Sequence, residues 1–333
     1  MFLVAGALPN TGSYDWAVPS RDVSRHFFCE FTRTVRIVEG GLPSMRAGTR
    51  WRTSRLLLIA TLASGCGAEV GAPIRIDEPV ELLSYDDAPA WSPDGSRIAY
   101  MRRRASPPTM GIWIVDTAGV ATHEVLHGAW GYPDWSPDGT RLAISYIGIY
   151  SVTPTGDSLQ VITTKGFTPR WSPDGNELAF QNVDNYSIGS IGLVSRDGTG
   201  LRSLAPTGSD LWQPDWSPDG TRLVHVRRPS PEEIFVMDTT GHVEQRLTMD
   251  EYSDTSPVWS PDGQWIAWTS QRQAGGEIWL MKPDGTGAHA LTLGDYPSWS
   301  PDSRRIAFAK TISNTALLFA IDIATSRIRQ ITQ

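Results

Sequence analysis

The chain of 333 residues contains six histidines, and two of these stand four residues apart with an acid between them. His123, Glu124 and His127 are residue types that bind transition metals. They lie in the segment THEVLHGAW, which we expect to be an outer strand. In a strand, a spacing of four places the two imidazoles on one face but about 13 Å apart. No phosphate loop, cysteine cluster or nucleophile elbow occurs either. The sequence therefore predicts no metal, no cofactor and no catalytic constellation.

Six aspartates recur within one short motif. The sequence WSPDG begins at Trp91, Trp135, Trp171, Trp216 and Trp259, and the variant WSPDS begins at Trp299. Calcium requires several oxygens within one loop, whereas each copy here supplies a single carboxylate. Proline, aspartate and glycine in this order are typical of a tight turn, in which glycine takes the left-handed conformation. At Ser303, which replaces this glycine, a left-handed backbone costs on the order of 1 kcal/mol, unless the turn relaxes.

The motif marks an internal repeat. Successive copies are 44, 36, 45, 43 and 40 residues apart, and a proline stands two residues before every motif tryptophan. Short alternating apolar runs follow each turn and are typical of strands. Each repeat supplies about four strands, which cannot bury both faces of their sheet alone, whereas units arranged radially can. We therefore predict an all-β chain forming a six-bladed β-propeller of four-stranded antiparallel blades, with the tryptophans packed between blades.

The pattern P-x-W-S-P-D-G-x-x-[IL]-A resembles the WD-like repeat of the TolB propeller family over roughly residues 81–333. In TolB a separate α/β domain precedes the propeller and acts in the Tol envelope system. Too few residues precede the first repeat here for such a domain, so the resemblance implies a propeller without it. Propellers of the prolyl-oligopeptidase type carry similar repeats fused to a hydrolase domain, but no suitable G-x-S-x-G motif is present.

The N-terminal third resembles an export signal. Residues 45–66 have a basic start, a short apolar run and small residues before Cys66, which is the layout of a secretory signal ending in a lipobox-like cysteine. We expect lipidation at Cys66, with a simple cleaved signal as the alternative. Residues 1–44 are then an upstream extension from a mis-assigned gene start and are expected to be disordered. Residues 67–80 form a linker, and 81–333 form the propeller. This organisation predicts a periplasmic lipoprotein anchored in the bacterial envelope.

The charge balance argues against a nucleic-acid partner. The chain has 29 basic and 36 acidic residues, and excess negative charge repels phosphate backbones.

The loops entering each repeat are the candidate binding site. They should gather at one mouth of the propeller, together with the loops joining second and third strands. Every entering loop carries an aromatic residue, most carry acids, and aromatic residues and arginines dominate interface energetics. The candidate mouth residues are Tyr85, Asp87, Arg103, Trp130, Tyr132, Phe167, Asp210, Trp212, Tyr252, Asp254 and Tyr296.

Three functions remain open on this sequence. The first is a non-catalytic scaffold that docks a protein partner in the envelope. The second is capture of a carbohydrate or small ligand at the mouth. The third is a propeller lyase or hydrolase, for which Asp87, Asp210, Asp254 and Arg103 are the first candidates and a carboxylate pair with raised pKa values would be the distinguishing feature. The sequence does not fix the oligomeric state.

Overall fold

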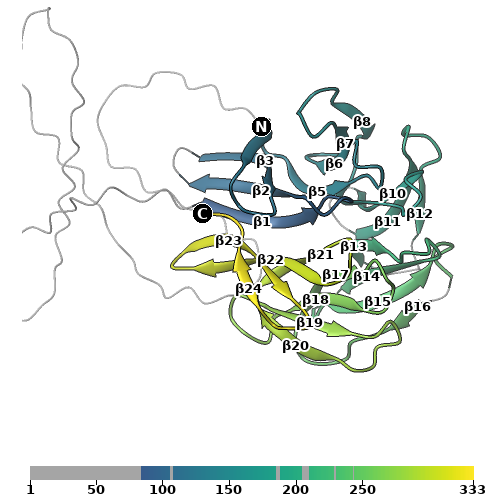
Figure 1. The fold of residues 1–333 in the computed structure, drawn as a ribbon. Coiled ribbons are helices and arrows are strands. Elements are labelled where there is room, and N and C mark those ends of the chain that lie inside the picture. The colour runs from purple at the N-terminus through teal and green to yellow at the C-terminus, as the bar shows by residue number, and fades with distance from the viewer. Residues whose placement is uncertain (1–83, 106–107, 185–187, 205–209, 229, 243) are drawn as a thin grey trace, which may run out of the picture. The chain divides into compact units, whose positions relative to one another are not determined.

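The computed structural model describes residues 84–333, apart from 106–107, 185–187, 205–209, 229 and 243. The elements within these residues are 24 β-strands, so the described part of the chain is all-β (Figure 1). Among the described residues no helix is long and apolar enough to cross a bilayer. The expected signal, Cys66 and the linker lie outside the described residues.

The strands fall into six consecutive units of four, and each unit contains one copy of the motif. Unit 1 holds β1 (Ser84–Trp91), β2 (Arg97–Ala105), β3 (Pro108–Asp116) and β4 (Thr122–His127). Unit 2 holds β5 (Gly131–Trp135), β6 (Leu142–Ser145), β7 (Ile149–Val152) and β8 (Gln160–Thr163). Unit 3 holds β9 (Phe167–Trp171), β10 (Glu177–Asp184), β11 (Ile188–Ser195) and β12 (Arg202–Leu204). Unit 4 holds β13 (Asp210–Trp216), β14 (Arg222–Arg228), β15 (Glu233–Asp238) and β16 (Glu244–Arg246). Unit 5 holds β17 (Asp254–Trp259), β18 (Ile266–Ser270), β19 (Glu277–Met281) and β20 (His289–Leu293). Unit 6 holds β21 (Asp295–Trp299), β22 (Arg305–Ile312), β23 (Thr315–Asp322) and β24 (Ile328–Gln330).

The units form a β-propeller of four-stranded antiparallel blades. Units 2, 3, 4 and 5 are four separate sheets, whereas units 1 and 6 share one eight-stranded sheet through a single parallel pairing of Tyr85 with Ala316. The prediction of an all-β propeller with four-stranded antiparallel blades is confirmed, but four such blades stand as separate sheets, not the six that we predicted. The reason is the length of β1, the longest of the first strands, whose early residues reach β23.

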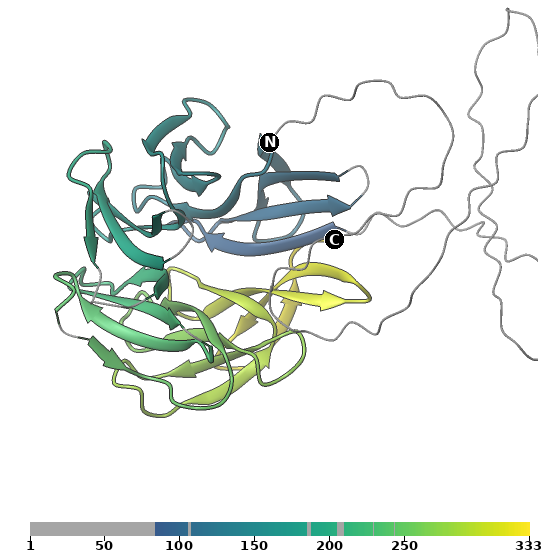
Figure 2. The ribbon, with the colours of Figure 1, turned by 180° about the vertical axis from the view of Figure 1, so that it is seen from behind.

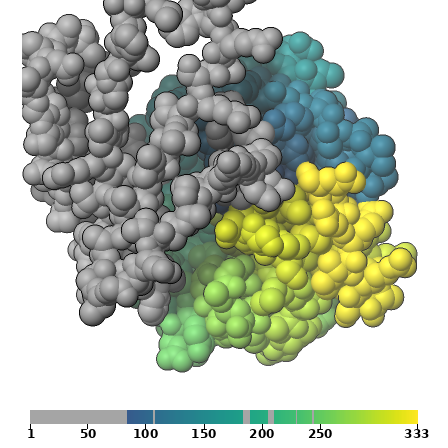
Figure 3. Space-filling model, turned by 90° about the vertical axis from the view of Figure 1, so that its left-hand side faces the viewer, coloured from purple at the N-terminus to yellow at the C-terminus, as the bar shows by residue number. Residues whose placement is uncertain are grey.

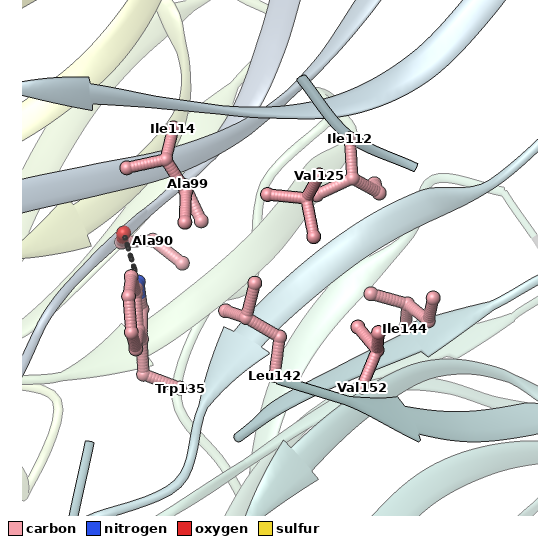
Figure 4. Close-up of a cluster of buried hydrophobic side chains, with 9 residues drawn as sticks. All are labelled: Ala90, Ala99, Ile112, Ile114, Val125, Trp135, Leu142, Ile144 and Val152. Carbon is pink, nitrogen blue, oxygen red and sulfur yellow. Dashed lines mark hydrogen bonds between the residues drawn. The ribbon is translucent and has the colours of Figure 1, made fainter. Parts of the chain in front are cut away.

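The core lies between neighbouring units, and the motif tryptophans fill it. Trp135 of unit 2 is 5% exposed and packs against Ala90, Ala99 and Ile114 of unit 1 (Figure 4). Its indole Nε1 donates a hydrogen bond to the carbonyl of Ala90 at 3.2 Å. The predicted role of this tryptophan in packing is confirmed.

The motif turns are held by their own side chains. In unit 1, Ser92 Oγ donates to Asp94 Oδ1 at 2.6 Å, and Gly95 has a φ of 69°. Hydrogen bonds from Ser92 and Ser96 lower the pKa of Asp94 to about 2. In unit 6, Ser303 keeps the left-handed conformation with a φ of 56°. Its Oγ accepts a hydrogen bond from the backbone N–H of Asp262 in unit 5 at 3.0 Å, and this bond offsets the backbone strain.

The junctions between units alternate between two hydrogen-bond arrangements. At the first, third and fifth junctions, the indole Nε1 of Trp135, Trp216 or Trp299 donates to a backbone carbonyl of the preceding unit, at 3.2 to 3.3 Å. At the second and fourth junctions, a carboxylate of the preceding unit accepts from the tryptophan backbone N–H. These bonds join Asp134 to Trp171 at 2.7 Å and Asp215 to Trp259 at 2.8 Å.

The junction of unit 6 with unit 1 has the arrangement of the second and fourth junctions, with a serine hydroxyl in place of the carboxylate. Ser298 Oγ accepts from the backbone N–H of Trp91 at 3.3 Å. Beside this bond, Trp91 and Ile98 of unit 1 share one buried cluster with Ala307 and Leu318 of unit 6. The first and last units therefore lie side by side, as the blue and yellow parts of the chain show in Figures 2 and 3. The sequence of residues 79–85 is strand-like and predicts a pairing with the last repeat that fastens the propeller. Residues 79–83 lie outside the described residues, and Tyr85 does pair with Ala316 of unit 6.

Candidate functional site

The strand register defines one face of the propeller, which we call the mouth. In unit 1, Ser84 at the start of β1 pairs with Arg104 near the end of β2. The start of each first strand consequently lies beside the connection from the second to the third strand. The motif turns join the other ends of the first and second strands, so they lie on the opposite face. The mouth is thus built from segments outside the motif.

Each first strand has a β-bulge three residues before its motif tryptophan. The residue at this position has a positive φ between 48° and 54° in every unit, and in no unit is it glycine. Left-handed backbone outside glycine is uncommon and persists where the surrounding structure holds it. The six bulge residues are Ala88, Tyr132, Thr168, Gln213, Ser256 and Tyr296.

The bulge residues line one central channel. Five of the six prolines that follow them and Arg170 complete its wall, so all six units contribute to it. The channel leaves about 30 Å³ for water-sized molecules, which is room for roughly two waters. A sugar ring or a peptide segment therefore requires the wall to move before it can enter.

Arg170 places a positive charge at the channel wall and lies between two half-buried carboxylates. Its guanidinium lies 3.9 Å from Asp134 and 3.5 Å from Asp215. Burial raises the pKa of both carboxyls, that of Asp215 to about 7, while Arg170 acts in the opposite direction. Because the same carboxylates accept hydrogen bonds from the tryptophan backbones of the next units, they join neighbouring units, while Arg170 lines the channel.

An acid–tyrosine cluster lies at the mouth where units 6, 1 and 2 meet. Asp87 is 5% exposed and forms an ion pair with Arg103, and its second oxygen, Oδ1, has no hydrogen-bond partner among the residues that the structure describes. The rings of Tyr132 and Tyr296 are 6.4 Å apart, and both interact electrostatically with Asp87. Burial raises the pKa of Asp87 to about 6, although Arg103 lowers it. Tyr85 joins the cluster, with the Arg103 guanidinium 5.9 Å from its ring.

Unit 2 presents aromatic side chains at the mouth. The Trp130 ring packs edge-on against Tyr150 at 5.0 Å and lies 5.8 Å from the ring of Tyr146. Tyr146 and its neighbour Ile147 are 46% and 56% exposed. This part of the mouth is therefore apolar and open to a partner.

Unit 4 combines an aromatic ring with charge. Asp210 Oδ1 accepts hydrogen bonds from the Trp212 indole and from the backbone of Gly189, both at 2.6 Å. The guanidinium of Arg228 lies 3.7 Å from the centre of the Trp212 ring. Asp210 thus orients the Trp212 indole, and the Arg228 guanidinium lies against the face of that ring.

Unit 5 contributes Tyr252, which is 38% exposed, and Asp254, which is fully buried. In unit 3, Phe167 is half-buried opposite Gln181, and the neighbouring Thr168 lines the channel in its place.

The structure thus gathers Tyr85, Asp87, Arg103, Tyr132 and Tyr296 into one cluster. It places the other candidate residues in separate units around the mouth.

Sequence reasoning missed Arg170 of the channel wall and the two carboxylates beside it. Asp134, Arg170 and Asp215 occupy the variable position of P-x-W, immediately before the motif tryptophan. Their signal was a charged residue within a strand that should otherwise be buried. Among the described residues, no group of three or more His, Cys, Asp or Glu side chains could hold a metal ion. His127 instead contacts Glu124 at 3.1 Å, and His123 contacts the carbonyl of Pro154 at 3.2 Å.

The blades, channel and mouth define a β-propeller of the TolB class. Residues 155–333, more than half of the chain, match the family described as the TolB beta propeller domain, PD40. The chain belongs to that family. The resemblance drawn from the WSPDG repeats is therefore confirmed.

Individual relatives match shorter parts of the chain. The uncharacterized protein Atu1656 of Agrobacterium fabrum is 37% identical over 87 residues, which are 26% of this chain and 30% of that protein. The Tol-Pal system protein TolB of Desulfosudis oleivorans is 31% identical over 105 residues, 31% of this chain and 24% of its own. The chain thus spans less than a third of these curated relatives.

Solved structures share the fold. The crystal structure of TolB from Acinetobacter baumannii superposes with a TM-score of 0.62 at 22% identity, over 71% of this chain and 63% of that chain. An oligogalacturonate lyase in complex with manganese superposes with a TM-score of 0.55 at 12% identity, over 77% and 79% of the two chains. Both comparisons describe the fold alone.

Proposed function

We propose that this protein is a non-catalytic docking module of the bacterial envelope, whose propeller mouth binds a protein partner. The observation that carries the proposal is the mouth itself. Arginines stack on aromatic rings in three units, with Arg103 near Tyr85, Arg228 over Trp212 and Arg272 over Trp279. Rigid aromatic and arginine side chains are the groups that supply most binding energy at protein interfaces.

The narrow channel supports docking on the surface over capture inside it. A volume of about 30 Å³ does not admit a sugar ring, since ligand pockets for small molecules typically hold about 300 Å³ or more. The exposed Tyr146 and Ile147 of unit 2 offer apolar contact area outside the channel. A flat or protruding protein surface fits this arrangement better than a small ligand does.

The proposal includes the domain organisation of the whole chain. Residues 45–66 act as an export signal ending at a lipidated Cys66, and residues 67–80 link the anchor to a propeller of residues 81–333. Residues 1–44 are an upstream extension. The eight-stranded sheet works as two blades, which makes a ring of six. Membership of the TolB propeller family and the similarity to a Tol-Pal system protein support a location in the periplasm, and the layout of residues 45–66 supports the membrane anchor.

The test is a crosslinked pull-down of the native protein from its own envelope fraction, read by mass spectrometry. The double variant Trp212→Ala, Tyr252→Ala removes two mouth aromatics, and we expect it to lose a reproducible partner. The control Val120→Ala, Leu201→Ala removes two exposed apolar side chains from turns on the opposite face, and it should retain the partner. Equal capture by both variants would place the interface elsewhere and reject docking at the mouth.

One observation favours an enzyme as the second candidate. Asp87 has a pKa raised by burial to about 6, a free Oδ1 and two neighbouring tyrosines, and perturbed carboxyls are common in active sites. Asp295 nearby also has a pKa raised by burial, but its Oδ1 already accepts from Thr269 and from the backbone of Tyr296, both at 2.8 Å. Turnover of an oligosaccharide or peptide, abolished by Asp87→Asn, would establish this alternative.

A further inference from the structure

Unit 1 contains a complete internal guanidinium site at the mouth. Arg102 donates two hydrogen bonds to the fully buried Asp86, from Nε to Oδ1 and from a terminal nitrogen to Oδ2, each at 2.7 Å. Its guanidinium lies 5.2 Å from the centre of the Tyr100 ring and 5.1 Å from that of Trp113. A buried carboxylate is tolerated when it is paired and hydrogen-bonded in this way.

Unit 5 repeats the acid and the rings of this site but not its arginine. Asp254, Trp268 and Trp279 occupy the positions of Asp86, Tyr100 and Trp113, because β17, β18 and β19 pair in the same register as β1, β2 and β3. At the position of Arg102, which faces Asp86, unit 5 has Ser270, which faces Asp254.

Asp254 consequently lacks a hydrogen-bonded counter-ion. It is 0% exposed, and within the described part of the chain neither carboxylate oxygen accepts a hydrogen bond of ordinary length. Burial raises the pKa of Asp254, although weaker hydrogen bonds from the Ser270, Trp268 and Thr248 side chains lower it. A buried charge left in this state is unfavourable, so an arrangement that brings a cation to Asp254 is favoured by comparison.

Arg272 is the cation within reach, but another acid holds it. Its guanidinium stacks on Trp279 at 4.2 Å, forms an ion pair with Asp250, and donates to Ser270 Oγ at 2.6 Å. The distance from its NH1 to Asp254 Oδ1 is 3.8 Å, too long for a hydrogen bond. Arg272 therefore stands between two carboxylates and bonds only one of them.

The two carboxylates differ in access. The Asp250 side chain is 29% exposed, and Tyr252 beside it is 38% exposed, with its ring 5.3 Å from the Arg272 guanidinium. Asp254 is sealed from solvent. A cation from outside can thus reach Asp250 and the Tyr252 ring, whereas Asp254 has Arg272 as its neighbouring cation within the described residues.

We infer that Asp250 and Tyr252 form a subsite for a basic side chain of the docked partner, and that its binding transfers Arg272 from Asp250 to Asp254. The incoming cation takes over the ion pair with Asp250 and lies against the Tyr252 ring. Arg272 remains stacked on Trp279 and moves by about an ångström to bond Asp254, as Arg102 bonds Asp86 in unit 1. This inference rests on the proposed docking function and specifies the partner as a protein with an exposed arginine or lysine.

The mechanism predicts that a buried residue controls affinity without touching the ligand. Asp250 and Asp254 would be coupled through one arginine with two positions, which is a physical link between an exposed and a buried site. Such couplings commonly change affinity about fivefold or more. The net acidic charge of the chain favours approach of a basic partner.

The test uses N-acetyl-arginine amide as the probe and N-acetyl-citrulline amide, a neutral ligand of nearly the same shape, as its control. Binding to the folded protein is followed by NMR through the indole signals of Trp268 and Trp279, in wild type, Asp250→Asn, Asp254→Asn and Asp197→Asn. Asp197 is an exposed turn residue of unit 3, so its variant matches the change of charge.

We expect the arginine probe to bind the wild type and Asp197→Asn equally, to bind Asp254→Asn about fivefold more weakly, and not to bind Asp250→Asn. Citrulline should not bind. Equal affinity of wild type and Asp254→Asn, equal binding of the two probes, or no binding of arginine would each overturn the inference. The pull-down decides the docking function separately, because the NMR test uses no partner protein.

A second measurement addresses the unpaired state itself. Asp254→Asn removes a buried charge whose cation, Arg272, is too distant for a hydrogen bond, so its unfolding midpoint in urea should equal or exceed that of the wild type. Asp86→Asn breaks a complete buried pair, so its midpoint should fall. A comparable fall in both variants would show that Asp254 is already satisfied and would overturn the proposed exchange of Arg272.

Discussion

Replacing Asp215 by asparagine should remove part of the pH dependence of stability. Burial raises the pKa of Asp215 to about 7 in the folded protein, whereas an unfolded aspartate titrates near its ordinary value of about 3.9. Between pH 5 and pH 7 the folded state therefore binds more protons at this residue than the unfolded state does. The free energy of unfolding must then decrease as the pH rises through this range.

The pKa difference sets the size of this effect. For a folded pKa of about 7, the contribution of Asp215 falls by at most about 2 kcal/mol between pH 5 and pH 7. The side chain retains 17% exposure, and this hydration acts to reduce the loss. Asparagine keeps a side-chain oxygen for the Trp259 backbone bond at 2.8 Å but cannot ionise. The Asp215→Asn variant should consequently have a flatter stability profile than the wild type.

Urea unfolding at pH 5, 6 and 7, followed by tryptophan fluorescence, measures this difference. Asp197→Asn is the control, since hydrogen bonds from Thr199 lower the pKa of Asp197 and move its titration below this range. The control should follow the wild-type slope. If Asp215→Asn follows the wild-type slope as well, the carboxyl is ionised throughout, and the argument from burial is wrong.

Three further substitutions test other parts of the structure by urea unfolding. Ser303→Ala keeps the left-handed strain and loses a hydrogen bond, so it should lower the free energy of unfolding by about 1 kcal/mol. Ser303→Gly loses the bond and the strain together and should be nearly neutral. Equal losses in the two variants would show that the backbone strain is not offset by this bond. Arg102→Met leaves Asp86 buried without its partner and should cost about 3 to 5 kcal/mol; a cost below about 1 kcal/mol would show that the pair is not needed. Gly192→Ala places a Cβ 2.4 Å from the ring of Phe180 and should cost about 1 to 3 kcal/mol; an unchanged unfolding midpoint would mean that the ring moves freely.

The sequence predicts the strands well because their signals are local. The WSPDG turn carries its own hydrogen bonds, and the alternating run after it places each second strand at a fixed distance from the motif tryptophan. Trp135 could be assigned to packing because one large apolar residue per repeat has no other place in a sheet of this kind. The strand-like run of residues 79–85 predicts a pairing with the last repeat, and Tyr85 does pair with Ala316. The merging of units 1 and 6 into one sheet could not be predicted, because its register links residues 231 positions apart.

The residues of the site are harder to predict from the sequence than the strands of the fold. The channel is lined by residues in left-handed backbone, yet their types are Ala, Tyr, Thr, Gln, Ser and Tyr. Glycine would have marked such positions, and its absence hides them. Tyr132 and Tyr296 were found because aromatic residues in loops suggest binding, whereas Thr168, Gln213 and Ser256 have no such signal. The contrast between Asp86 and Asp254 depends on which residue faces each acid across the strand pair, and this requires the register.

The residue before each motif tryptophan decides how neighbouring units are joined. Where it is Asp134, Asp215 or Ser298, its side chain accepts from the tryptophan backbone of the next unit. Where it is Ala90, Arg170 or Val258, the side chain has no acceptor atom, and its backbone carbonyl accepts from the next indole instead.

The two arrangements alternate through all six junctions, and the junction of unit 6 with unit 1 follows the alternation. The indoles of Trp91, Trp171 and Trp259, which belong to the first arrangement, are the motif indoles without a hydrogen-bond partner in the described residues. The junction between the last and first units therefore has the same kind of hydrogen bond as the second and fourth junctions. The single strand pairing that merges these units into one sheet is an addition to that junction rather than its cause. This explains how four separate sheets and one double sheet can come from six copies of the same repeat.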